Sequence, residues 1–166
     1  MKPLSISIIT LCIIIISPKL QAQLKVTAKC PAVEVDILDG KVNGLKPDRT
    51  PSEIAGKLPC FTSKEEDNSS SKCGGVIAYK DKDIYFYTGR NYVDIGPAFK
   101  GKLSIPVMGS KRGSLFRTLG NPKLKETKWD AWQTSYGCLI LYYGAGNKVN
   151  RIRFSTYGTD VIQLCE

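Results

Sequence analysis

The 166-residue chain contains no histidine, so the side chain that most often acts as a general base near neutral pH is missing. No serine stands in a GxSxG motif, and Ser70, Ser71 and Lys72 lie in a polar loop. The consecutive carboxylates of residues 65–67 are expected to be exposed to solvent. These features predict a protein that is not an enzyme, with a small secreted hydrolase kept as a further alternative.

The cysteines also lack the spacing of a metal site. No Cys-x-x-Cys pair occurs, and without histidine the usual ligand sets for zinc cannot be assembled. We therefore expect neither a metal nor another cofactor.

A long hydrophobic run is missing as well. The apolar stretch from about Ile6 to Ile16 is shorter than the roughly 20 residues that cross a bilayer. It follows Lys2 and precedes Pro18, Lys19 and a small residue at Ala22, which is the order of a cleaved secretory signal peptide. The sequence predicts a signal peptide over residues 1–22 and a periplasmic or secreted protein of bacterial type.

Acidic residues are fewer than basic ones. The chain has 24 lysines and arginines against 15 acidic residues, and loss of Lys2 and Lys19 with the leader leaves 22 against 15, or +7. The basic residues are scattered and form no arginine-rich helix, which argues against nucleic acid as a partner. For an exported protein, this charge favours solubility, anionic envelope polymers or an acidic partner protein.

A pattern that recurs with an offset near 61 divides the chain into two units, residues 23–97 and 98–166. Gly40-Lys41-Val42 corresponds to Gly101-Lys102-Leu103, and each unit continues with a short helix and a β-hairpin. The first helix is expected from Pro51 to before Pro59, behind the capping box that Thr50 opens, and the second from Ser110 through Thr118.

The expected hairpins are residues 75–79 with 84–88, and 138–143 with 149–155. Two further strands are expected at 33–37 and, as a closing edge strand, at 160–165. The predicted fold class is α+β: two tandem helix-plus-hairpin units share one antiparallel sheet, with the helices on one face.

Strand alternation assigns the faces of this sheet. In the hairpin strands, Ile84 and Phe86 should face the core, so Tyr85 and Tyr87 should share the open face. By the same argument Ile152 and Phe154 point inward. Arg151 and Arg153 should then lie on the open face.

Five cysteines remain after the leader, and an oxidising compartment favours disulfides between them. Cys60 follows the first helix and Cys73 precedes the next strand, so a bridge between them would close a loop of about 13 residues, worth roughly 3 kcal/mol. Cys30 and Cys165 are then expected to pair, which leaves Cys138 free.

The second unit resembles the SmpA/OmlA-type unit of small outer-membrane-assembly lipoproteins. The resemblance rests on Gly109-Ser110-Lys111, on Leu119-Gly120-Asn121-Pro122 and on the hairpin that ends near Phe154. Two such units in tandem, over roughly residues 38–157, resemble the BLIP-like fold of beta-lactamase inhibitor proteins. The resemblance implies a concave sheet that docks on another protein, and a turn aspartate, here Asp81, that enters the active site of the target.

The candidate protein-binding residues are those of the turn, the tyrosines and arginines of the open face, and the two tryptophans. For each, a structural alternative stands: the turn can be a soluble loop, the tyrosines can pack across strands, and the WDAW sequence can anchor a sheet edge. The set is Asp81, Lys82, Asp83, Tyr85, Tyr87, Trp129, Trp132, Tyr142, Arg151 and Arg153.

These observations predict an exported protein-binding module. The leading hypothesis is an inhibitor or immunity-type protein that docks its sheet on an envelope or secreted enzyme and inserts the Asp81 turn. The alternative is a scaffold for envelope assembly.

Overall fold

The computed structural model describes residues 29–68 and 73–165 of the chain. The predicted signal peptide, residues 1–22, lies outside the described residues. Within the described ranges, no helix has the length and apolar character needed to cross a membrane.

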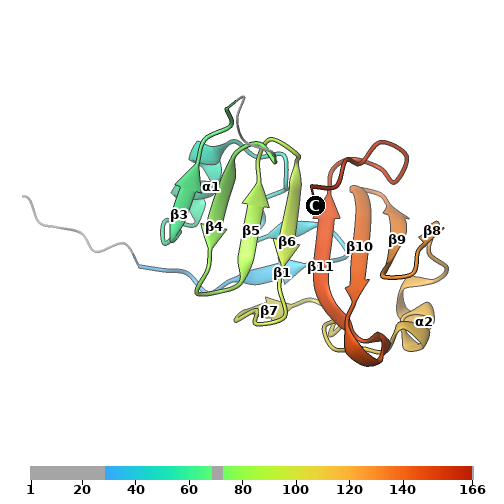
Figure 1. Ribbon diagram of the computed structural model, residues 1–166. Helices are drawn as coiled ribbons and strands as arrows, with labels where there is room; N and C mark the ends of the chain where they lie inside the picture. The colour runs from blue at the N-terminus through green and yellow to red at the C-terminus, as the bar shows by residue number, and fades with distance from the viewer. Residues whose placement is uncertain (1–28, 69–72, 166) are drawn as a thin grey trace, which may run out of the picture.

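Eight antiparallel strands form one continuous sheet (Figure 1). Each half of it is a four-stranded meander, and the halves join where β6 pairs with β11, with Val93 opposite Phe154 and Ile95 opposite Ile152. From one edge to the other, the strands are β3 (Ser63–Glu65), β4 (Val76–Tyr79), β5 (Ile84–Tyr87), β6 (Tyr92–Ile95), β11 (Val149–Ser155), β10 (Gly137–Tyr143), β9 (Trp129–Thr134) and β8 (Leu124–Lys125).

A second layer lies behind this sheet in Figure 1. It contains a three-stranded mixed sheet in the order β2, β1, β7, in which β1 and β7 are parallel, so the two halves of the chain contact each other here too. The strands of this small sheet are β1 (Glu34–Asp36), β2 (Lys41–Val42) and β7 (Lys102–Leu103). The remaining elements are α1 (Pro51–Lys57), the 3-10 turn η1 (Arg112–Ser114), α2 (Phe116–Leu119) and the 3-10 turn η2 (Ala145–Asn147), which lies in the connection between β10 and β11.

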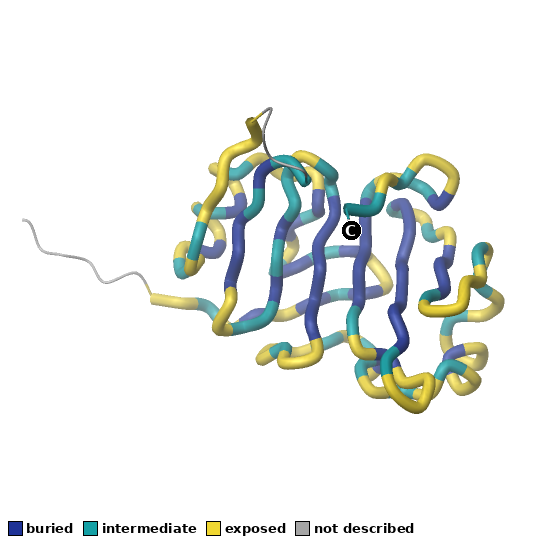
Figure 2. Tube along the Cα trace, viewed as in Figure 1, coloured by how far each residue is buried: buried dark blue, intermediate teal, exposed yellow. Residues whose placement is uncertain are grey.

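The core fills the space between the two layers. It takes alternate residues of the large sheet, such as Ile84, Phe86 and Phe154, which are fully buried. Strands β6 and β10 are buried along their whole length in Figure 2, while exposed residues collect in the turns and at the sheet edges. The predicted inward orientation of these residues is confirmed.

The predicted α+β class is wrong, because the described chain is mostly β. The two predicted hairpins exist, as β4–β5 and β10–β11, but each is only the inner pair of a four-stranded meander. Strands β3, β6, β8 and β9 were not predicted. Residues 160–165, predicted as an edge strand, form no strand.

The two predicted helices differ in outcome. Helix α1 begins at Pro51 as expected, with the capping box formed by Thr50 and Glu53. The second helix does not begin at Ser110, because the Ser110 hydroxyl donates to the Pro106 carbonyl instead of capping. The chain forms only the 3-10 turn η1 and the four-residue helix α2 in this region. Gly113 and Ser114 are weak helix formers, which is consistent with these short elements.

Candidate functional site: the outer face of the eight-stranded sheet

The outer face is the side of the large sheet that points away from the second layer. Alternation places Tyr85 and Tyr87 of β5 on it, as predicted, because their neighbours Ile84 and Phe86 are in the core. Across the strands, Tyr85 stands opposite Asp94 and Tyr87 opposite Tyr92. The face therefore carries aromatic and charged side chains side by side.

An ion pair occupies the centre of this face. The Arg153 guanidinium donates to both carboxylate oxygens of Asp94, with Nε–Oδ1 and Nη2–Oδ2 distances of 2.6 and 2.7 Å. Both residues are buried. Burial alone would lower the pKa of Arg153, but the hydrogen bonds and charge of Asp94 outweigh it and raise the pKa above its ordinary value.

Aromatic rings flank the ion pair on both sides. The Arg153 guanidinium lies 4.3 Å from the ring centre of Tyr92, and Tyr92 packs on Tyr87 with 4.6 Å between the ring centres. On the other side, the Arg151 guanidinium lies 3.9 Å above the Tyr142 ring. These contacts fix the orientation of the tyrosines across four strands.

Arg153, a predicted binding residue, is buried in the ion pair. It lies on the predicted face but is 1% exposed. Arg151, two residues away on the same strand, is partly exposed. The Arg153 guanidinium is enclosed by Asp94, Tyr92 and Tyr142. The C-terminal segment, residues 156–165, returns toward the outer face after β11 (Figure 1).

The C-terminal segment is held by apolar and polar contacts. Ile162 and Leu164 pack against a cluster on the outer face that includes Ile140. Gln163 accepts a hydrogen bond of 2.6 Å from Arg90, and the Thr159 hydroxyl donates to Gln133 over 2.9 Å. The segment is thus fixed against the outer face near the end of β11.

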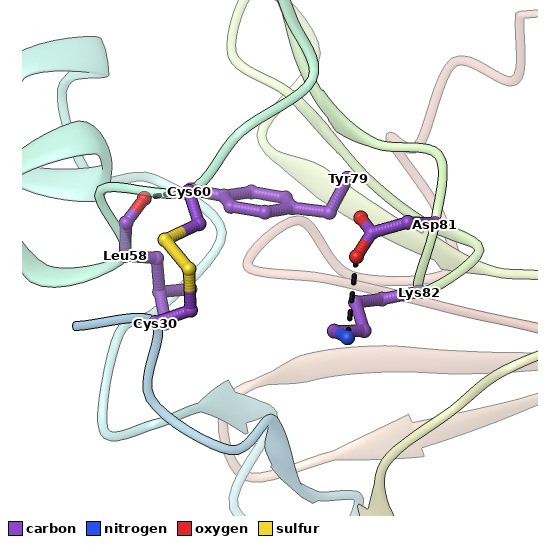
Figure 3. The surroundings of a disulfide bond; sticks show 6 residues. All are labelled: Cys30, Leu58, Cys60, Tyr79, Asp81 and Lys82. Carbon is purple, nitrogen blue, oxygen red and sulfur yellow. Dashed lines mark hydrogen bonds and ion pairs between the residues drawn. A yellow bond between two sulfur atoms is a disulfide. The ribbon is translucent and has the colours of Figure 1, made fainter. Parts of the chain in front are cut away.

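Two disulfides are present, but their pairing differs from the prediction. Cys30 pairs with Cys60 and Cys73 pairs with Cys165, instead of Cys60 with Cys73 and Cys30 with Cys165. The chain that leads into β1 passes the end of α1, which brings Cys30 to Cys60 (Figure 3). The C-terminal segment ends beside the start of β4, which brings Cys165 to Cys73. The two bridges indicate an oxidising, exported compartment.

Cys138 is free, as predicted, and it is buried. Burial raises the pKa of its thiol to about 11. A thiol with this pKa is almost entirely protonated at neutral pH, and the thiolate is the reactive form. Cys138 is therefore a core residue rather than a nucleophile.

Two hollows open on the outer face, one on each side of the Cys73–Cys165 bridge. The first hollow, of about 340 Å³, is lined by Cys73, Ala78, Lys80, Tyr85 and Tyr87, among others. The second hollow, of about 470 Å³, is lined by Glu126, Lys128, Trp129, Tyr142, Arg151 and Cys165, among others. Five predicted binding residues thus line the two hollows: Tyr85, Tyr87, Trp129, Tyr142 and Arg151.

The acidic turn is not part of these hollows. Asp81 and Lys82 lie on the other side of the hairpin, in a small hollow of about 70 Å³ beside the Cys30–Cys60 bridge (Figure 3). Their side chains form an ion pair of 3.2 Å. Lys80 is the residue of this turn that lines the first hollow.

Asp83 has a structural role. Its carboxylate accepts the backbone amide of Ala98 over 2.9 Å, and its own backbone has a φ of 55°. A side chain on Gly96 would collide with this carboxylate, so the carboxylate can hold this position only beside a glycine. Burial raises the pKa of Tyr85, and the charge and hydrogen bond of Asp83 raise it further.

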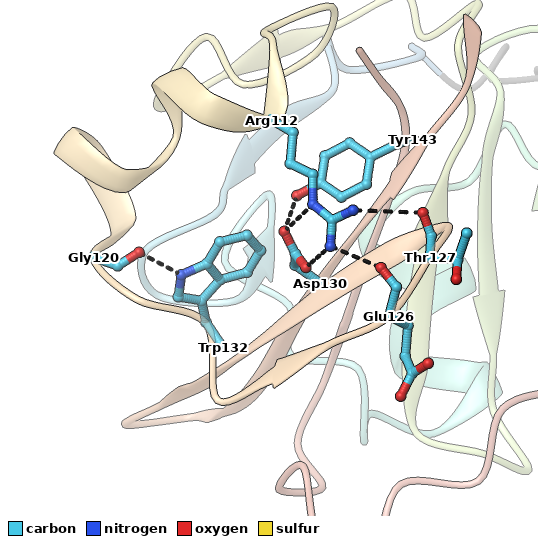
Figure 4. A network of polar contacts seen from close by, with 7 residues as sticks. All are labelled: Arg112, Gly120, Glu126, Thr127, Asp130, Trp132 and Tyr143. Atoms are coloured by element: carbon cyan, nitrogen blue, oxygen red, sulfur yellow. Dashed lines mark hydrogen bonds and ion pairs between the residues drawn. The ribbon is translucent and has the colours of Figure 1, made fainter. Parts of the chain in front are cut away.

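The two tryptophans of the WDAW sequence face opposite sides of β9. Trp129 lies on the outer face, in the second hollow. Trp132 points to the core, is 5% exposed, and its indole Nε1 donates to the Gly120 carbonyl over 3.1 Å (Figure 4). Trp132 is the structural anchor that the alternative interpretation of this sequence described, and Trp129 remains a candidate for binding.

Sequence reasoning missed a buried network around Asp130. Its carboxylate accepts from Arg112 Nε over 2.9 Å and from the Tyr143 hydroxyl over 2.7 Å, and Arg112 Nη2 also donates to the Glu126 carbonyl (Figure 4). The network ties η1 to β9. An aspartate between the two tryptophans of the WDAW sequence was the available signal, since a buried carboxylate needs a cationic partner.

The chemistry that these groups can perform is recognition. Within the described ranges, no three histidine, cysteine, aspartate or glutamate residues gather as a metal site would require. The buried acids are each held by an arginine. Comparison of the chain with protein-family models, curated proteins and solved structures finds no match.

Proposed function

We propose that this is an exported, non-enzymatic protein that binds another protein through its outer face and acts as an inhibitor of that partner. The observation that carries the proposal is the pair of aromatic hollows on one rigid sheet, set apart by the Cys73–Cys165 bridge. Hollows of this kind accept side chains that protrude from a partner surface.

The residues in these hollows are of the kind that dominates protein interfaces. Tyrosine, tryptophan and arginine give a large contact area for little lost rotamer freedom. Here part of that freedom is already lost, because Tyr87 packs on Tyr92 and Arg151 packs on Tyr142. Binding to a preorganised surface costs less entropy, which favours a tight complex.

The absence of histidine from the chain and the buried, protonated Cys138 support a role in binding rather than in catalysis. The recognition surface in this proposal is the two hollows, with Lys80 as the contribution of the predicted turn. An inhibitor works by covering the active site of its partner, which a broad sheet face can do without chemistry of its own.

The proposal can be tested by photo-crosslinking of the mature, oxidised protein. A photoreactive amino acid is placed at Lys80 beside the first hollow, at Lys128 beside the second, and at Lys57 on α1 as a control; all three lysines are exposed. The same partner from envelope or culture fractions should crosslink at positions 80 and 128 and not at 57. Crosslinking to one partner mainly at Lys57 would show that a different surface binds.

Alanine variants then measure the contribution of each hollow. Tyr85→Ala combined with Tyr87→Ala, and separately Trp129→Ala, should weaken binding by about tenfold or more, as for residues at the centre of an interface. Phe61→Ala is the matched control, because Phe61 is 37% exposed and lines neither hollow. Circular dichroism checks that each variant folds.

Activity of the identified partner separates inhibition from scaffolding. An enzyme that loses activity on addition of the protein, and keeps it with the Trp129→Ala variant, supports the proposal. A partner that binds at both hollows but keeps its activity would contradict inhibition and favour a scaffold.

A further inference from the structure

The net positive charge lies almost entirely in the second half of the chain. Residues 23–97 contain 11 basic and 11 acidic residues, whereas residues 98–166 contain 11 basic and four acidic residues. Two of those acids are engaged internally, Asp130 with Arg112 and Asp160 with Lys123. The second half therefore presents a strongly basic surface.

Part of this charge surrounds a groove on the other side of the sheet from the two hollows. The basic groove, of about 660 Å³, lies between η1, α2 and β9, and its lining includes Lys111, Arg112, Phe116, Pro122, Lys125 and Trp132. Figure 4 shows Arg112, Trp132 and the elements that carry them. The basic groove shares no residue with either hollow.

Lys111 and Lys125 line the groove, Lys148 directly follows the lining residue Asn147, and among the described residues no nearby acid balances these lysines. Over residues 29–68 and 73–165, no carboxylate lies within 4.0 Å of Lys111, Lys125 or Lys148. Lys111 and Lys148 also stand directly opposite each other in an isolated β-bridge. Like charges in such a position repel, so this arrangement costs stability that a bound anionic group would restore.

The groove also has an apolar wall. Phe116 is 58% exposed, although it lies on a short helix beside the buried Trp132. The one acid in the lining, Asp130, is buried, and its oxygens already accept from Arg112 and Tyr143. A ligand would thus meet lysine cations and an aromatic ring rather than a carboxylate.

We propose that the basic groove binds an acidic segment of a protein, with carboxylates on the lysines and an aromatic or aliphatic side chain against Phe116. The combination of charge and apolar wall favours a protein segment over a phosphate polymer, which has no apolar groups to place there. A concave groove also suits an extended segment better than a membrane surface. This inference does not depend on what the two hollows bind.

A synthetic peptide rich in glutamate, with two phenylalanines and a fluorescent label, serves as the probe. Its binding to the mature, oxidised protein is followed by fluorescence anisotropy. Binding should weaken when salt is raised from about 0.05 to about 0.5 M. Replacing Lys111, Lys125 and Lys148 together by glutamine should weaken it by about tenfold or more, and Phe116→Ala by about fivefold.

The matched control replaces three other exposed lysines, Lys57, Lys100 and Lys102, by glutamine, which changes the net charge by the same amount. An equal loss of binding in this control would overturn the proposal, because only net charge would then matter. If Phe116→Ala leaves peptide binding unchanged, the groove would be a surface for any polyanion, and this result would also overturn the proposal. Binding to phosphatidylglycerol vesicles but not to the peptide would assign the groove to lipid instead.

Discussion

The ion pair between Asp94 and Arg153 allows a quantitative test of how the outer face is built. Asp94→Asn removes the negative charge and leaves the Arg153 guanidinium buried without a counter-ion. Arg153→Met does the reverse and leaves a buried carboxylate. Breaking one side of a buried pair typically costs about 3–5 kcal/mol, because the remaining charge is no longer compensated.

Replacing both partners should cost much less than the two single changes together. The double variant Asp94→Leu with Arg153→Met buries no charge, and apolar replacement of a buried pair is often neutral or stabilising by about 1–4 kcal/mol. It does lose the contacts of the guanidinium with Tyr92 and Tyr142, at ring-centre distances of 4.3 and 5.3 Å. Each such contact contributes about 0.5–2 kcal/mol. We therefore expect the double variant to be more stable than either single variant.

Urea unfolding with the disulfides intact measures these free energies, with tryptophan fluorescence as the signal. If the free energy of unfolding falls by about 2 kcal/mol per molar urea, the midpoint of unfolding of each single variant should lie about 2 M below that of the unmodified protein. The decrease in the free energy of unfolding should change little with salt concentration, since salt screens a buried ion pair only weakly. Two results would refute the account of a buried, coupled pair. One is a decrease in the free energy of unfolding of under about 1 kcal/mol in the single variants, and the other is a decrease in the double variant that equals the sum of the two single decreases.

Three further predictions concern the bridges, the free thiol and one glycine. Replacing Cys73 and Cys165 by serine should lower the free energy of unfolding by about 4–5 kcal/mol in the chain-entropy model, and replacing Cys30 and Cys60 by about 3–4 kcal/mol. The first loss is larger because the sequence separations are 92 and 30. Thermal unfolding of the two variants gives the order of these losses, and the reverse order would contradict the prediction. The Cys138 thiol should resist thiol reagents until the protein unfolds, because it is buried. The free energy of unfolding should also fall as the pH rises from about 9 toward 11. Burial raises the pKa of this thiol to about 11, so in this range the folded state holds a proton that the unfolded chain releases. Cys138→Ala should flatten this decline, and an unchanged curve would assign it to other groups. Gly137→Ala should lower the free energy of unfolding, measured with urea, by at least about 3 kcal/mol. The reason is that Gly137 has a φ of 143° and that a side chain there would collide with the Ser155 carbonyl. A decrease of under about 1 kcal/mol would show that the backbone at this turn can relax.

Short-range signals predicted the parts of the fold that short-range contacts form. Helix α1 follows from the capping box at Thr50, and the β4–β5 hairpin follows from alternation on both sides of a four-residue turn. In each case the residues that decide the structure lie within a few positions of each other. Strand β6 (Tyr92–Ile95) was missed, and one of its two pairing partners, β11, lies about 60 residues away in the sequence.

Long-range placement also explains the errors at the candidate site. Arg151 and Arg153 are equivalent by alternation, but Arg153 is buried in its ion pair with Asp94 from the other half of the sheet, and Arg151 is partly exposed. The disulfide pairing depends on the path of the C-terminal segment, because Cys165 reaches Cys73 only if residues 156–165 cross the sheet. An apolar run at a chain end can be an edge strand or a cover over a face, and its composition does not distinguish the two.

The Cys73–Cys165 bridge therefore has a consequence for the proposed function. It contributes a cysteine to the lining of each hollow, so the bridge lies between the tyrosines of the first hollow and Trp129 of the second, whose separation the sheet sets. If both hollows bind one partner, that partner must present two protrusions at this separation with a shallow recess between them for the bridge. Reduction of the bridge should then weaken binding more than removal of either hollow alone, because it releases the C-terminal segment and removes one wall of both sites.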